Sequence, residues 1–265
     1  MRFGRLVLPI ALLLPGLATA QLSDRLAGDG VVIGGDDRAA SAVPACAFDA
    51  GRTVQVFAPV GGAWRTGSAS LVRIPGGAGQ TVFLTAASTL YDVAGDRSRL
   101  LAPRGELRVG LETAQGATCR FGGMRVAWTR LIRAGWLEGA LAVFRVEDHD
   151  AVMRGAAAPG LAEPGQCSGQ AVALSSIQQG VVRDRAIRQA CRIVAMPGDP
   201  AGRGMLIGHD CDAGQGAVGG ALSCRAGADL AAVGVHAGGT TSGALNVAVK
   251  LTPAIIAEIA AITPP

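Results

Sequence analysis

The sequence contains very little lysine and few aromatic residues. Lys250 is the only lysine among 24 basic residues, and aromatic residues make up 4% of the 265 positions. The basic residues are nearly balanced by 20 acidic ones, and they form no dense basic patch with interleaved aromatic side chains. Proteins that bind nucleic acid carry such a patch, so we do not expect nucleic acid as a partner.

The ligand spacing of a structural zinc site is also missing. No two cysteines form a C-x-x-C pair, and the three histidines lie far apart in the sequence. Structural zinc sites are built from closely spaced cysteine and histidine ligands, so we expect no metal site and no other cofactor. Each histidine also has an interpretation that is structural and not functional. His149 would lie in a solvated acidic turn, His209 would lie in a structural turn, and the His236 ring would be hydrogen-bonded by neighbouring backbone.

The N-terminus contains a short apolar run but no long one. Leu6–Leu14 follows Arg2 and Arg5 and precedes Ala18-Thr19-Ala20. The run is too short to span a bilayer, and the three-part pattern is typical of a secretory signal peptide. We therefore predict that residues 1–20 are a signal peptide, that the mature chain begins at Gln21, and that the protein is secreted or periplasmic.

An even number of cysteines remains after such processing. In an exported chain this pattern favours disulfides, up to three here, with the pairing left open by the sequence. The six candidates are Cys46, Cys119, Cys167, Cys191, Cys211 and Cys224.

Most of the chain consists of short apolar segments separated by turns rich in glycine and proline, with no internal repeat. This spacing predicts an all-β barrel or sandwich. The expected strands are Thr53–Phe57, Ser68–Ile74, Thr81–Ala87, Leu107–Leu111, Arg125–Thr129, Leu141–Val146, Ala171–Leu174, Val181–Arg185, Arg192–Ala195, Met205–Ile207 and Ala231–Val235.

Turn-rich stretches divide the mature chain into an arm and two lobes. We expect a loose N-terminal arm at residues 21–44, an N-terminal β-barrel at 45–158 and a C-terminal β-barrel at 159–265. The last segment should be a short helix, with Thr252 as its N-cap and Pro253 at its first position. Its isoleucines would then pack one face on the body; they are Ile255, Ile256, Ile259 and Ile262.

Three segments occur in a fixed order along the chain. They are Thr66–Val72 followed by Phe83–Ser88, then Leu137–Val143, and finally His209–Leu222. They resemble the signature of the trypsin-like serine proteases, most of all the bacterial glutamyl-endopeptidase branch. That family has a Gly-Ser-Gly strand with Leu-Thr-Ala-Ala-His, then Asp-x-Ala-Leu, then Gly-x-Ser-Gly-Gly-Pro at these places. The resemblance implies two six-stranded-type β-barrels with the active-site cleft between them.

Two flanking segments extend the resemblance to nearly the whole mature chain. Val32–Arg38 is similar to the mature N-terminus of the bacterial branch, and Gly234–Gly239 is similar to the strand that walls its specificity pocket. One trypsin-like domain would therefore cover about residues 32–262. The sequence leaves open whether the arm before Val32 is removed; if it stays, no new N-terminus forms that could insert and order the pocket.

The positions that match the catalytic triad hold unsuitable side chains. The imidazole base is replaced by Ser88, whose hydroxyl cannot act as a base at neutral pH. The nucleophile is replaced by Val218, which has no lone pair, and the carboxylate position holds Glu138, which has no imidazole to orient. A disulfide found beside this site in many relatives is also missing, because Arg65 and Thr89 stand at its two ends.

Backbone groups need no particular side chain and could survive these changes. The resemblance implies an oxyanion hole from the N–H groups of Gly216 and Val218. It also implies a pocket beside His236, Gly238 and Gly239, where glutamyl-specific relatives use a histidine to meet an acidic side chain.

The first functional hypothesis is a catalytically inactive binding protein, a pseudoprotease that holds a peptide or protein ligand. The second is an active serine-type hydrolase that uses non-standard residues, which requires a histidine or cysteine close to a hydroxyl. The third is a structural, envelope-associated domain whose loops fill the cleft. The sequence determines neither the ligand nor the oligomeric state.

Overall fold

The computed structural model describes residues 30, 32–33, 53–60, 63–94, 97–100, 108–110, 124–132, 140–154, 158–167, 171–178, 185–194, 204–240 and 244–265. The predicted signal peptide, Glu138, Cys46 and Cys119 lie outside these ranges, as do most of the predicted arm and of the strand expected at Val181–Arg185. Predictions for those residues stay predictions.

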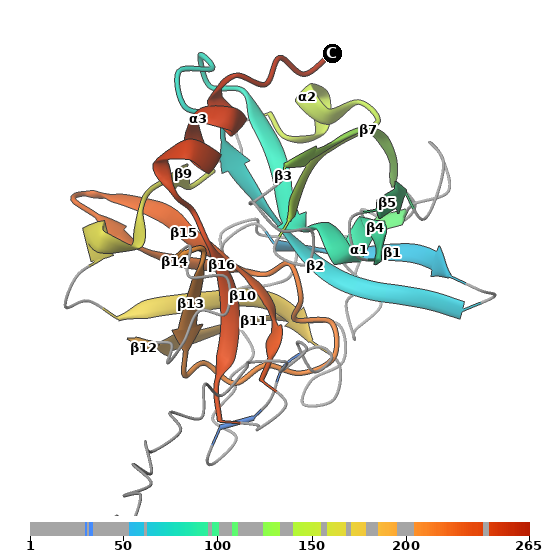
Figure 1. Cartoon of the computed structure of the whole chain (residues 1–265). Helices are drawn as coiled ribbons and strands as arrows, with labels where there is room; N and C mark the ends of the chain where they lie inside the picture. The colour runs from blue at the N-terminus through green and yellow to red at the C-terminus, as the bar shows by residue number, and fades with distance from the viewer. Residues whose placement is uncertain are drawn as a thin grey trace, which may run out of the picture.

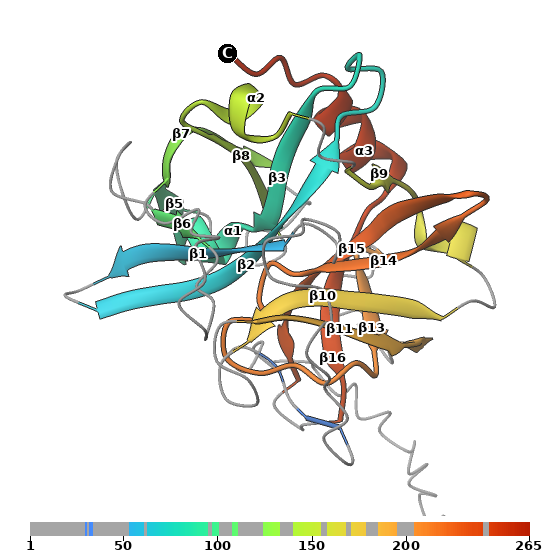
Figure 2. The ribbon, with the colours of Figure 1, turned by 180° about the vertical axis from the view of Figure 1, so that it is seen from behind.

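The described chain forms two β lobes, which Figures 1 and 2 show from opposite sides. Within it, six strands close a barrel in the order β1-β2-β3-β8-β7-β6, and an eight-stranded sheet makes the second lobe. The first lobe contains β1 (Thr53–Val60), β2 (Ala63–Arg73), β3 (Thr81–Ala86), α1 (Ala87–Leu90), β4 (Tyr91–Ala94), β5 (Arg97–Leu100), β6 (Arg108–Gly110), β7 (Met124–Ile132), β8 (Leu141–Val146) and α2 (His149–Val152). The second contains β9 (Gly160–Leu161), the 3-10 turn η2 (Pro164–Cys167), β10 (Val172–Gln178), β11 (Arg185–Cys191), β12 (Ile193–Val194), β13 (Leu206–His209), β14 (Ala221–Ala226), β15 (Asp229–Gly239), β16 (Asn246–Lys250) and α3 (Pro253–Ala260).

Strand β3 shows why the lobes pack closely. Phe83 points into the first barrel and stacks on Phe144 of β8 with ring centroids 5.1 Å apart. Its neighbours Val82 and Leu84 point the other way, into an apolar cluster shared with the second lobe. Because successive side chains of a strand face opposite sides, β3 is buried on both faces and its sequence is almost continuously apolar.

The C-terminal helix α3 closes the same cluster. Thr252 Oγ1 accepts a hydrogen bond from the N–H of Ile255 at 3.3 Å, and Pro253 is the first helical residue, as predicted. Ile255, Ile259 and Ile262 are buried against both lobes. The two-lobed β architecture and this helix confirm the predicted fold class.

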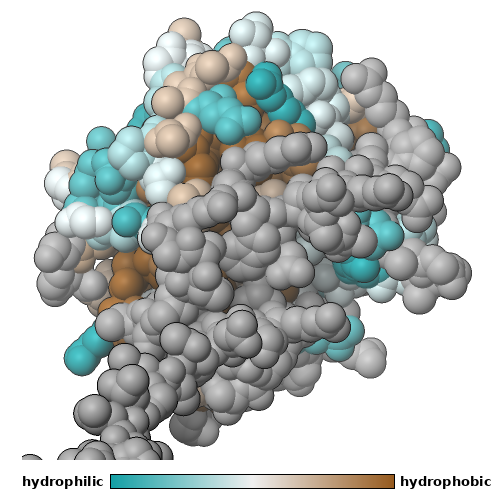
Figure 3. Space-filling model, in the orientation of Figure 1, coloured by the Kyte–Doolittle hydropathy of each residue, from teal (hydrophilic) through white to brown (hydrophobic). Residues whose placement is uncertain are grey.

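Few apolar side chains reach the surface. Trp64 and Val32 are the large hydrophobic residues exposed within the described ranges. Figure 3 shows brown, hydrophobic residues between paler and teal ones on the upper part of this face. None of the described helices has the length and hydropathy needed to cross a membrane.

Candidate functional site

The turn before β14 carries Val218, the residue at the predicted nucleophile position. Its side chain is 9% exposed and belongs to the apolar cluster between the two lobes. Its carbonyl accepts a hydrogen bond from the N–H of Ser68 in β2 at 2.7 Å. Val218 therefore packs as a core residue at the junction of the lobes.

The same turn carries two backbone N–H groups for which the described residues provide no acceptor. The Gly216 carbonyl accepts a hydrogen bond from the Ser68 hydroxyl at 2.7 Å, and Gly216 has a φ of +90°. No described residue accepts a hydrogen bond from the N–H of Gly216 or from that of Val218. Their use as an oxyanion hole stays a prediction.

Ser88, at the predicted base position, lies in the single turn α1 beside β8. The N–H of the preceding Ala87 donates to the Ala140 carbonyl at 2.9 Å, which holds this turn against the chain that follows Glu138. The Arg65 guanidinium donates to the carbonyls of Ser88 at 2.9 Å and Tyr91 at 3.3 Å. These two bonds attach the turn to β2.

Strand β15 carries the predicted pocket residues and is hydrogen-bonded to the turn that contains Val218. The N–H of Gly219 donates to the His236 carbonyl, and the N–H of His236 donates to the Gly220 carbonyl, both at 2.8 Å. Gly238 and Gly239 follow at the end of the strand, next to an irregularity in its pairing with β16. The structure thus brings the predicted pocket strand and the nucleophile position together.

His236 does not rely on backbone alone. Its Nδ1 lies 3.0 Å from Nε2 of His209, and both rings are fully buried. The two histidines come from β15 and β13, which pair with opposite edges of β16. The two histidines are far apart in the sequence and come close because β13 and β15 flank the same strand, β16. Burial, and then the nearby His236, hold the pKa of His209 well below its usual value.

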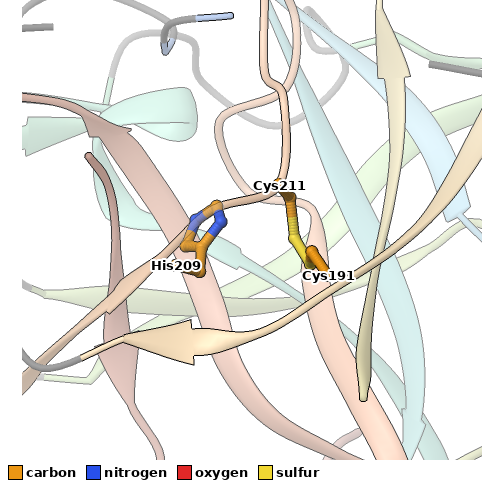
Figure 4. Close-up of side chains that lie close together, drawn as sticks. All are labelled: Cys191, His209 and Cys211. Atoms are coloured by element: carbon orange, nitrogen blue, oxygen red, sulfur yellow. A yellow bond between two sulfur atoms is a disulfide. The ribbon is translucent and has the colours of Figure 1, made fainter. Parts of the chain in front are cut away.

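His209 also lies beside a disulfide. Cys191 and Cys211 are joined, with Cα atoms 5.0 Å apart, and a second disulfide links Cys167 and Cys224. Figure 4 shows the His209 ring next to the Cys191–Cys211 bridge. The three possible metal-ligand atoms lie within 4.8 Å of one another. Because thiolates are the metal-binding form of cysteine, the disulfide leaves only the His209 nitrogen as a ligand.

The prediction of a solvated His149 is wrong. Its ring is 4% exposed, packs edge-on against Phe83, and lies 3.0 Å from the Thr81 hydroxyl. Its neighbours in the turn do face solvent, so the acidic sequence context concealed one inward-facing residue. Burial first, and then the positive charge of Arg145, lower the pKa of His149 to about 4.

This burial predicts a loss of stability in mild acid. The unfolded chain protonates His149 near its ordinary pKa of 6.5, whereas the folded protein keeps it neutral down to about 4. Its contribution is therefore complete above pH 6.5 and falls as the pH drops toward 4. Urea unfolding at about pH 7 and about pH 5 should show a loss on the order of 2 kcal/mol from this residue. His149→Gln should flatten that dependence; an unchanged pH profile in the variant would contradict the assignment.

No protein-family model and no curated protein matches the amino-acid sequence. Solved structures do match. A Glu endopeptidase superposes with a TM-score of 0.63 at 18% identity, over 86% of this chain and 97% of that chain. The protease Anisep from Arthrobacter nicotinovorans gives 0.53 at 12% identity, over 75% and 89%. A scabies mite inactivated protease paralogue gives 0.53 at 17% identity, over 75% and 88%. The protein thus has the two-barrel fold of trypsin-like serine proteases.

Proposed function

We propose that this protein is an exported serine protease homologue without catalytic activity, which binds a peptide or protein segment between its two lobes. The observation that carries the proposal is Val218 at the nucleophile position, packed into the apolar cluster between the lobes. A valine offers no lone pair for attack on a carbonyl. Its side chain instead packs among the apolar residues of the cluster.

The distribution of histidines supports the loss of catalysis. The sequence has three, and all lie in the described ranges. His209 and His236 are engaged with each other, and His149 contacts Thr81. Position 88, which matches the base, holds a serine, and position 218, which matches the nucleophile, holds a valine. General-base catalysis needs an imidazole within hydrogen-bond reach of the nucleophile.

The backbone supports retained binding. The N–H groups of Gly216 and Val218 have no acceptor among the described residues, so a ligand carbonyl could receive them. Loss of protease activity on this fold has a counterpart, because one similar structure is that of an inactivated protease paralogue.

The described residues offer a candidate pair for the alternative of a hydrolase with non-standard residues. Thr81 Oγ1 and His149 Nε2 lie 3.0 Å apart. However, a histidine with a pKa of about 4 is a weak base, and its Nδ1 has no hydrogen-bond partner among the described residues to orient the ring. The third alternative, a structural envelope domain, predicts no ligand between the lobes.

The test combines proteolysis and binding. We expect the purified mature chain to leave casein and a quenched-fluorescent peptide library uncleaved, and to retain at least one class of extended peptide from an immobilised library. Cleavage abolished by Thr81→Val would establish the hydrolase alternative instead. An inert protein that binds no peptide would favour the structural alternative and contradict our proposal.

A further inference from the structure

The described part of the N-terminal arm is not loose. Its described residues, drawn in blue, lie beside the lower end of the second lobe (Figures 1 and 2). The N–H of Ile33 donates to Oδ1 of Asp212 at 2.6 Å. Asp212 is 1% exposed, so the arm reaches a carboxylate inside the lobe.

The anchor of this contact is itself fixed. Asp212 directly follows Cys211, whose sulfur is held by the disulfide and whose carbonyl accepts from the Asn246 amide at 2.7 Å. Asn246 belongs to β16, between the strands that carry the two buried histidines. The arm therefore contacts a part of the lobe that is held by covalent and sheet bonds.

Gly30 makes the closest approach. A Cβ atom added there would lie 2.5 Å from the Ala213 Cβ, 3.0 Å from Nε2 of His236 and 3.1 Å from Oδ1 of Asn246. Its φ of +130° is also one that residues with side chains rarely adopt. Only glycine fits this position, and its backbone covers the one imidazole nitrogen of His236 that does not face His209.

We infer that the surface formed by Asp212, Ala213, His236 and Asn246 is a binding site for an extended segment with glycine at the contact. Its occupant is the chain's own arm, through Gly30 and Ile33. This docking needs no free N-terminus, since an internal N–H of Ile33 makes the bond to Asp212. If the proposed function holds, the docked arm excludes any ligand side chain from His236, and arm and ligand compete.

Acylation of histidine by diethyl pyrocarbonate tests the docking. In the natural chain Gly30 shields His236, so peptide mapping should find it unmodified in the native protein. Gly30→Ala should release the arm and raise both His236 acylation and hydrogen exchange of the Ile33 amide by about tenfold or more. His149 and His209 serve as internal reporters that the fold is intact.

Gly76→Ala is the matched control. Gly76 also has a positive φ, +72°, but no atom lies within 4 Å of an added Cβ, so His236 should stay shielded. An Ile33 amide that exchanges at the rate of an unstructured peptide in the natural protein would overturn the inference, whatever the variants do. The inference would also be overturned if Gly30→Ala releases the arm and His236 nevertheless stays unmodified.

These readouts do not depend on a peptide ligand. If no peptide binds any variant, the proposed function fails while the docking result stands. If a peptide binds the natural chain and Gly30→Ala leaves its affinity unchanged, the competition between arm and ligand is refuted.

Discussion

The triple variant Ser88→His/Glu138→Asp/Val218→Ser should cleave casein at a rate at least about 100-fold above that of the natural protein. A positioned general base contributes roughly 10²–10⁴-fold to such reactions. The supporting backbone is in place: α1 is bonded to the chain that follows Glu138, and the turn of Val218 is bonded to β2. The two N–H groups needed for an oxyanion hole have no acceptor among the described residues.

The single variant Val218→Ser is the control for this gain. A serine without an imidazole partner is not activated, so this variant should remain as inert as the natural protein. Rates are compared on samples with matching circular dichroism and thermal unfolding. A folded triple variant without activity would show that the surroundings of Ser88 do not place an imidazole toward residue 218.

Gly219→Ala should destabilise the protein by at least about 4 kcal/mol, among the largest effects of a single substitution. A Cβ at this position would overlap the Ser68 carbonyl oxygen and Oγ1 of Thr85. Thr85 already donates to that carbonyl at 2.7 Å, so neither atom can move without breaking the contact between β2 and β3. The clash must instead push the Val218 turn away from the first lobe.

Gly227→Ala separates this clash from the cost of the backbone conformation. Gly227 has a φ of +65° and no atom within 4 Å of an added Cβ, whereas Gly219 has a φ of +92°. The Gly227 variant should lose only about 1 kcal/mol, from the left-handed conformation. Urea unfolding with the disulfides intact measures both. Equal losses in the two variants would mean that the lobes do not meet at Gly219 as described.

The strands that could be predicted from the sequence are those with large apolar or β-branched residues. Leu141–Val146 is found with the predicted bounds, and Thr252 caps the helix as expected. Strands β14 and β16 were not predicted. In β14 most residues are small or polar and carry little local preference for strands. Strand β16 is only five residues long and has two β-branched residues, Val247 and Val249. Their positions are set by pairing with β15, which no local pattern encodes.

The site was predictable where it depends on backbone order and unpredictable where it depends on long-range packing. The order of segments placed Val218 and His236 near each other, and the pairing of β15 with the turn agrees. The inward turn of His149 and the contact between His209 and His236 could not be inferred. Each depends on a partner far away in the sequence, Phe83 in one case and the shared neighbour β16 in the other.

The burial of Val218 affects how the fold tolerates a serine at this position. A change from valine to serine at this position would place a hydroxyl in the cluster between the lobes and remove apolar contacts there. Such an exchange costs on the order of 1–2 kcal/mol, before any base is present to use the hydroxyl. This substitution alone would thus lower the stability of the fold and would supply no imidazole to activate the new hydroxyl. Folding stability alone therefore favours valine over serine at this position.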